Sequence, residues 1–192
     1  MTDSEPRRQL LDDAIAYVAA NGLTDLSLRR LAAELGTSHR MLSHHFGSKE
    51  GLWVAIIQQV EQRQLALLDT MGLDPTASLG DTLWAWWQHI SHPSLWPNER
   101  LFFEVYGQAL HRRPHTAPLL DGIVDNWLAP AAALGEARGL PPDEARALAR
   151  LGLAVSRGLL LDLLATGDRA GVDAAMKRWI ALNEQRYGRP AR

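Results

Sequence analysis

Residues 27–52, SLRRLAAELGTSHRMLSHHFGSKEGL, constrain the fold more than any other stretch of this sequence. They predict one short helix after Ser27, a tight turn at Gly36 and a second short helix after Ser38, because serine is a preferred helix N-cap and glycine commonly follows a helix end. Two short helices joined in this way are typical of a helix-turn-helix unit, whose second helix enters the DNA major groove. The stretch therefore predicts a DNA-binding unit, which the rest of the chain pairs, positions or switches.

The remaining sequence has a helical pattern, in which apolar side chains recur every three or four residues and strand-like alternation is rare. Pro130 is expected to kink or split its helix, because proline lacks the N–H that a helix interior needs. The nine expected helices cover Pro6–Asn21, the stretches after Ser27 and Ser38, Ser48 to about Met71, Ala77–Ser91, Asn98–His111, Ala117–Arg138, Asp143–Thr166 and Arg169–Tyr187. Between the fourth and fifth of these helices, residues 72–75 are expected to form a break.

Charge is concentrated where the DNA contact is expected. The whole chain has a formal net charge of −2, but only the contact face of a DNA-binding protein must be basic. Between Ser27 and Lys49, Glu34 is the only acidic residue against four basic ones, which are Arg29, Arg30, Arg40 and Lys49.

The chain has no cysteine, which excludes disulfides and thiolate metal sites. A polar N-terminus without signal-peptide character, and apolar runs too short for a membrane span, lead us to expect a cytoplasmic protein.

Residues 22–52 resemble the DNA-binding domain of the TetR (tetracycline repressor) family of bacterial regulators. The resemblance lies in the order and spacing of Gly22, Ser27, Leu31-Ala32, Gly36, Ser38–His44, Phe46 and Ser48-Lys49-Glu50. It implies an all-α, nine-helix architecture with a three-helix DNA-binding domain over residues 1–50 and a helical effector-binding and dimerisation domain over residues 51–192. The fourth helix, at about 48–71, bridges the two domains.

The chain departs from the family pattern at two positions of the expected third helix. Many members carry a tyrosine at the position of Ser43, and a small residue at the position of Arg40. A long cationic side chain at position 40 can read a guanine, since bidentate arginine–guanine pairing is the commonest specific base contact. We therefore expect a retained docking mode and an unusual operator sequence.

The candidate DNA contacts lie at helix starts and on the outward side of the third helix. Free N–H groups at a helix start favour phosphate, although capping alone also explains the serines there. Lys49 resembles the phosphate-binding lysine of the family, and the alternative for it and for the other polar residues is an ordinary solvated surface. Within the third helix Met41 and Leu42 are expected to face inward, and His45 and Phe46 to pack against neighbouring helices. The predicted DNA-binding residues are Ser27, Arg29, Ser38, His39, Arg40, Ser43, His44 and Lys49.

The last two expected helices, within about residues 143–187, carry apolar side chains on more than one face. One face is expected to meet the core and another a partner, and Gly152 and Gly158 to permit close helix approach. The resemblance implies a homodimer through these helices, with two recognition helices about 34–36 Å apart on a near-palindromic operator. The alternative is a fully buried core helix in a monomer.

Aromatic side chains are concentrated in the middle of the chain. They are expected to line a pocket for a small hydrophobic or aromatic effector, and the alternative is that they only fill the core. These residues are Trp84, Trp86, Trp87, Phe102, Phe103, Tyr106 and Trp127.

The sequence thus favours a ligand-responsive repressor of transcription, with activation left open. The alternative is a ligand- or protein-binding helical module that keeps the helix-turn-helix only as a scaffold. No enzyme, cofactor or metal site is expected. The closely spaced histidine pairs, His89/His92 and His111/His115, have no glutamate in the arrangement that a zinc protease needs.

Overall fold

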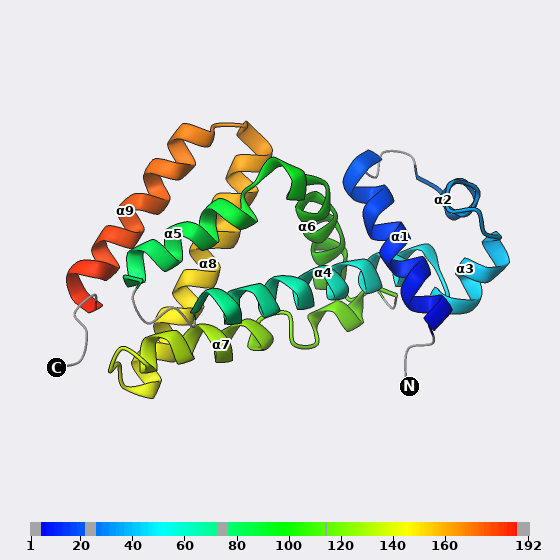
Figure 1. The fold of residues 1–192 in the computed structure, drawn as a ribbon. Coiled ribbons are helices and arrows are strands. Elements are labelled where there is room, and N and C mark those ends of the chain that lie inside the picture. Colours follow the sequence, from blue (N-terminus) through cyan, green and yellow to red (C-terminus); the bar gives the residue numbers. More distant parts are fainter. Residues whose placement is uncertain (1–4, 22–25, 73–76, 114, 188–192) are drawn as a thin grey trace. The chain divides into compact units, whose positions relative to one another are not determined.

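The computed structural model describes the chain except residues 1–4, 22–25, 73–76, 114 and 188–192, and it also leaves the side chains at 69, 71 and 72 undescribed. The described residues form nine α-helices and two short 3₁₀ helices, and no strand (Figure 1). The α-helices are α1 (Glu5–Asn21), α2 (Leu28–Glu34), α3 (His39–Phe46), α4 (Lys49–Gly72), α5 (Leu79–Ile90), α6 (Trp96–Leu110), α7 (Asp125–Glu136), α8 (Pro142–Thr166) and α9 (Arg169–Tyr187); the 3₁₀ helices are η1 (Pro93–Leu95) and η2 (Ala117–Leu120). The predicted all-helical class and the number of helices are confirmed. Gly22 and most of the expected break at 72–75 lie outside the described residues.

The chain divides into two compact units, and the first combines Met1–Arg63 with Pro93–Asp121. In this unit α1 packs against α6, α2 packs against α3, and both 3₁₀ helices pack against α6. Arg63 of α4 forms an ion pair with Asp12 of α1, and both side chains remain about half exposed. The core consists of aliphatic side chains that are almost completely buried, among them Val18, Leu31, Leu42, Leu52, Ile56 and Leu101.

The second unit combines Gln64–His92 with Gly122–Arg192. In it α7 packs along α8, α5 packs against α9, and α8 packs against α9. Small residues allow the first of these contacts: Leu128, Ala132, Ala145 and Ala149 form one buried cluster. The close approach of α7 and α8 thus follows from alanine at the contact positions.

Hydrogen bonds between partly buried groups hold α5 against α9. The indole N–H of Trp87 donates to Asp173 Oδ1 at 2.7 Å, and Arg169 donates to Ser91 Oγ at 2.6 Å. The backbone N–H of Gly80 donates to Glu184 Oε1 at 2.9 Å. Because buried polar groups are costly to leave unpaired, these bonds specify one register between the two helices.

Two of the differences between the expected and the observed helices have a clear physical cause. The helix expected over Asn98–His111 begins at Trp96, because Pro97 lies in its first turn, where the missing N–H costs no hydrogen bond. The helix expected over Ala117–Arg138 is two elements, separated at Gly122, whose φ of +80° ends the regular backbone. Of the two expected effects of Pro130, a kink or a split, the split is excluded, because α7 continues through this residue. One lost backbone bond is outweighed there by the packing of Leu128 and Ala132 against α8.

Candidate nucleic-acid interface

Local hydrogen bonds define the helix–turn–helix that α2 and α3 form. Ser27 Oγ accepts from the N–H of Arg30 at 3.2 Å, and Ser38 Oγ accepts from the N–H of Met41 at 3.1 Å, so both serines are N-caps as predicted. After α2 the chain turns at Gly36, which has a φ of +63°. Bonds from Gly36 to the carbonyl of Ala33 (3.2 Å) and from Thr37 to that of Ala32 (2.9 Å) complete a Schellman end. The turn is therefore set by glycine and does not depend on distant contacts.

One face of α3 is buried and the opposite face is open to solvent. Leu42 is completely buried and Phe46 is 8% exposed, as expected for residues one helical turn apart. The prediction that Met41 faces inward is wrong, because this side chain is 41% exposed. Successive residues of a helix differ by about 100°, and with Leu42 and Phe46 directed at the core Met41 is rotated out of it.

The junction of α3 and α4 is unusually close. Ser48 Oγ accepts from the N–H of Gly51 at 3.0 Å and caps α4. A Cβ on Gly51 would lie 2.2 Å from the carbonyl oxygen of Phe46, a backbone atom that has no freedom to move aside. Gly51 therefore permits α4 to begin directly against the end of α3. Sequence reasoning missed this role, for which a glycine in the first turn of an otherwise apolar helix was the available signal.

Arg7 links the start of α1 to the end of α3. Its Nε donates to the carbonyl oxygen of His45 at 3.4 Å, and its guanidinium lies 5.0 Å from the centre of the Phe46 ring. Both contacts act at the C-terminal end of α3, where a cation also complements the helix dipole. Sequence reasoning did not identify Arg7, because no local pattern links residues that far apart.

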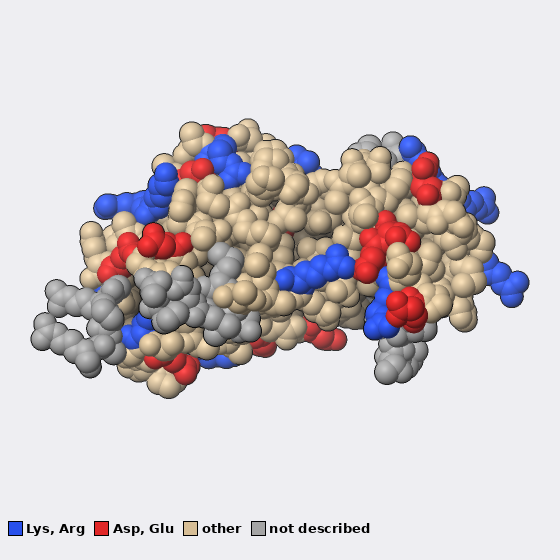
Figure 2. All heavy atoms as spheres, viewed as in Figure 1, with Lys and Arg blue, Asp and Glu red and all other residues tan. Residues whose placement is uncertain are grey.

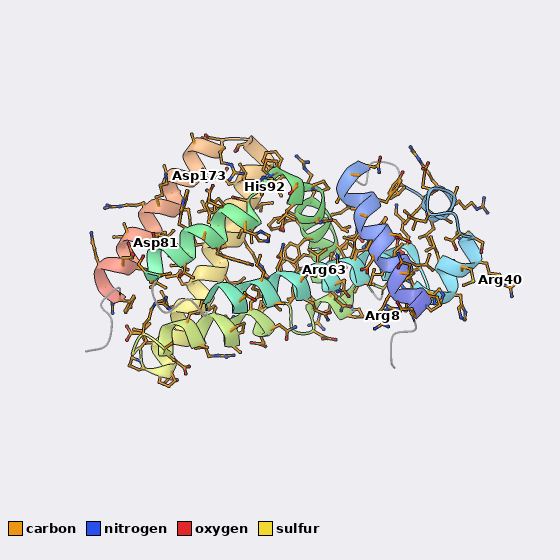
Figure 3. The ribbon with its side chains drawn as sticks, viewed as in Figure 1. Arg8, Arg40, Arg63, Asp81, His92 and Asp173 are labelled. Carbon is orange, nitrogen blue, oxygen red and sulfur yellow. The ribbon has the colours of Figure 1, made fainter. Side chains whose placement is uncertain are left out.

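The predicted DNA-contact residues lie at or near the surface of the first unit. Arg40 points away from the body of this unit (Figure 3), and basic side chains project at the end that α3 occupies in Figure 1 (Figure 2). Ser43 is half-buried, and Lys49 is exposed at the first position of α4, with its Nζ 5.9 Å from the centre of the Trp53 ring. The remaining predicted residues, Ser27, Arg29, Ser38, His39, Arg40 and His44, are all exposed. The surface thus offers cations and hydrogen-bond donors around a protruding helix.

The seven aromatic residues predicted to line an effector pocket divide between the two units. On α6, the Phe102 ring lies 5.2 Å from that of Phe103 and 5.3 Å from that of Tyr106, measured between centroids. In the second unit, the centroids of Trp86 and Trp127 are 5.7 Å apart. Trp87 is completely buried and bonded to Asp173, and Trp84 is half-buried beneath Lys177, whose Nζ is 4.6 Å from its ring centre. An effector pocket formed by these residues stays a prediction.

Other candidate sites are weaker. A hollow of about 250 Å³ in the first unit is lined by polar residues, namely Glu50, Gln108, Arg113, His115 and Thr116. In the described part of the chain, no three His, Cys, Asp or Glu side chains are grouped so that they could hold a metal ion.

Burial and then the charge of His92 lower the pKa of His89, which favours a neutral imidazole beside Trp86. None of the described helices combines the length and the apolar character needed to cross a membrane.

Comparison with known proteins identifies the type of domain that contains this helix–turn–helix. Residues 10–56 match the family described as "Bacterial regulatory proteins, tetR family". The match assigns this N-terminal domain to the TetR family. The match covers α1–α3 and the start of α4, which are the elements that build the helix–turn–helix.

Relatives extend the similarity beyond this domain. The HTH-type transcriptional regulator BetI of Brucella anthropi is 33% identical over 76 residues, which make up 40% of this chain and 36% of that relative. A crystal structure of a TetR transcriptional regulator from Legionella pneumophila superposes with a TM-score of 0.72 and 18% identity, and covers 95% of this chain and 99% of the other. The multidrug binding protein EbrR, complexed with imidazole, gives a TM-score of 0.62 and 27% identity, covering 92% of this chain and 90% of the other. The fold of these structures therefore extends over nearly the whole chain, whereas the family model matches residues 10–56.

Proposed function

We propose that this TetR-family chain is a DNA-binding repressor of transcription that inserts α3 into the major groove of an operator. The observation that carries the proposal is the asymmetry of α3, whose Leu42 and Phe46 are buried while Arg40 and His44 are exposed. The helix is held by its cap at Ser38, so its outer face is preorganised before DNA arrives. Ser27, Ser38 and Lys49 would contact phosphates, which fix the register, while Arg40 and its neighbours would read bases. A regulator of bacterial genes acts in the cytoplasm, where the chromosome lies.

The proposed regulator acts as a homodimer through α8 and α9. An uninterrupted row of exposed small and apolar residues follows α8 at alternating spacings of four and three, which is the pattern of a helix that packs against another helix. Leu151 and Leu161 in this row are each 52% exposed. The row consists of Ala147, Leu151, Ala154, Gly158, Leu161 and Ala165.

The two glycines of α8 have different surroundings. One lies against α9 of the same chain, and the other lies on the surface that we propose for the contact between two chains. At Gly152, a Cβ would lie 3.2 Å from the Trp179 ring, so the expected close approach is confirmed between α8 and α9. At Gly158, no atom of the described residues lies within 4 Å of the position that a Cβ would take. We therefore assign the space at Gly158 to the second copy of the chain, and Leu182 of α9, 52% exposed, to the same surface.

A small hydrophobic or aromatic effector completes the proposal. The similarity to EbrR, a multidrug binding protein, supports a small-molecule ligand for this chain too. In this proposal residues 1–50 bind DNA, residues 51–192 bind the effector and dimerise, and α4 joins the two functions. Release of DNA requires that the effector bind the non-operator state more tightly than the operator-bound state.

Selection from a random duplex pool tests DNA binding directly. We expect the full-length protein to enrich a near-palindrome at low ionic strength, because each copy of α3 reads one half-site. Exchange of Arg40 for alanine would weaken the enrichment, and the control Arg100→Ala on α6 would not, since this exposed arginine lies far from α3 in sequence. Titration of metabolite mixtures into the complex with the selected duplex then tests the effector. No enrichment at any ionic strength would favour the alternative, a helical module that keeps the helix-turn-helix only as a scaffold.

A further inference from the structure

The exposed face of α3 contains an apolar side chain among polar ones. Arg40, Met41 and His44 are all exposed, and they adjoin one another on the helix, since positions 40 and 44 are one turn apart and position 41 lies three before 44. Met41 is 41% exposed, while its chain neighbour Leu42 is completely buried. The exposed part of α3 therefore includes a guanidinium, a thioether and an imidazole next to one another.

Met41 is not one of the buried core residues of the unit. Its backbone N–H donates to Ser38 Oγ at 3.1 Å, a bond that any residue except proline would make. Its side chain does not complete the core, which Leu42 and Phe46 close on the other side of the helix. A long unbranched thioether is, however, well suited to fit an apolar group of a partner, because it has three rotatable bonds and a polarisable sulfur.

The major groove of DNA offers one type of apolar group at the edges of its bases, the C5-methyl of thymine. Apart from the small C5–H of cytosine, the other groups that distinguish the bases there are hydrogen-bond donors or acceptors, for which a thioether is a poor partner. Arg40 and His44 can use those polar groups, and Met41 beside His44 cannot. The complementary partner for Met41 is therefore a thymine next to the base pairs that the polar neighbours contact.

We propose that Met41 is a specificity-determining residue that packs against a thymine methyl group in each operator half-site. This inference rests on the proposed function, because it requires that α3 enter the major groove. It adds a contact that depends on shape and apolar surface to those that depend on hydrogen bonds. It also assigns a base preference, thymine, to a position of the operator.

Single replacement of each thymine of the selected operator by deoxyuridine tests the proposal, because uracil lacks the methyl group and keeps every hydrogen-bonding group. For the wild-type protein we expect one thymine per half-site at which the replacement weakens binding about fourfold, the value of one buried methyl-sized group. Replacement in both half-sites would weaken binding about 15-fold. The variant Met41→Ala should bind the thymine operator more weakly and show no further loss with deoxyuridine at that position.

The control variant is Leu110→Ala, which removes a more exposed apolar side chain (61% exposed) from α6 and should keep the full deoxyuridine loss. An unchanged deoxyuridine loss in Met41→Ala would overturn the proposal, because another residue would then contact the methyl. Wild-type binding that is insensitive to deoxyuridine at every thymine, or a selected operator without thymine, would overturn it while leaving the proposed function intact. If no duplex is selected at all, both the proposed function and this inference are wrong.

Discussion

Replacement of Leu151 and Leu161 by alanine should separate the proposed dimer into monomers. Both side chains lie on the outer row of α8, and each is 52% exposed in the single chain. Burial of a whole leucine side chain stabilises by about 2 kcal/mol, so covering the half that is exposed contributes about 1 kcal/mol. A two-fold axis brings four such side chains into the interface, and the double variant therefore loses about 4 kcal/mol of association free energy. This corresponds to an increase of the dimer dissociation constant by about 10³-fold.

Sedimentation equilibrium over a range of protein concentrations measures this change. We expect the wild-type chain to be dimeric at micromolar concentration and the double variant to be mainly monomeric. Helical content should remain unchanged, because neither leucine contributes to the buried core of its own chain. Leu110→Ala serves as the control, since Leu110 is more exposed but lies outside α8 and α9. A wild-type protein that is monomeric, or a double variant that dimerises as tightly as the wild type, would refute the assignment of this surface.

Four further substitutions test the proposed DNA contacts and the packing of the helices. Arg40→Ala should weaken binding to the selected operator by about 1–3 kcal/mol and relax the preference at one base position, as measured by titration with operator variants. Lys49→Ala should weaken binding to all sequences alike and reduce the slope of log affinity against log salt by about one, because it removes one phosphate contact. Gly51→Ala should lower DNA affinity and the melting temperature together, since its Cβ would meet the carbonyl oxygen of Phe46. Trp87→Phe should lower the free energy of unfolding by about 1–3 kcal/mol in denaturant titrations, because a buried hydrogen bond is lost, and leave DNA affinity unchanged.

For each of these four substitutions, one outcome would contradict the reasoning behind the prediction. If Arg40→Ala changed the salt slope and not the base preference, Arg40 would be a phosphate ligand. A Lys49 variant with a wild-type salt slope would place that lysine away from the DNA. Normal stability of Gly51→Ala would mean that the start of α4 can move from the end of α3. Loss of DNA affinity in Trp87→Phe, without loss of stability, would give this tryptophan a functional role that its burial does not suggest.

Local signals made most of the helix–turn–helix predictable from the sequence. Serine caps and a glycine turn act over three or four residues, and the hydrogen bonds of Ser27, Ser38 and Gly36 have the expected partners. The face of Met41 was predicted wrongly, because an eight-residue helix carries too few apolar positions to define its buried side. Whether the predicted residues contact DNA stays a prediction.

Other features depend on packing between segments that are distant in the sequence. The contact of Arg7 with His45 spans 38 positions, and no pattern within either helix indicates it. The continuation of α7 through Pro130 depends likewise on burial against α8, which local propensity does not include. Helix propensity describes the free energy that a residue costs in an isolated helix. In the folded protein, tertiary packing decides whether this cost is offset.

The proposed operator binding depends on the proposed dimer, because dimerisation sets the effective concentration of the second α3 at its half-site. An eight-residue α3 reaches only a few base pairs, so one copy cannot combine high affinity with specificity. When two copies are joined through α8 and α9, the second half-site binds at the effective concentration set by the first rather than at the bulk concentration. The loss of dimerisation in the α8 double variant should therefore weaken operator binding at nanomolar protein and make it depend on the square of protein concentration. At concentrations above the new dissociation constant, operator affinity should return, because the surface of α3 itself is unchanged.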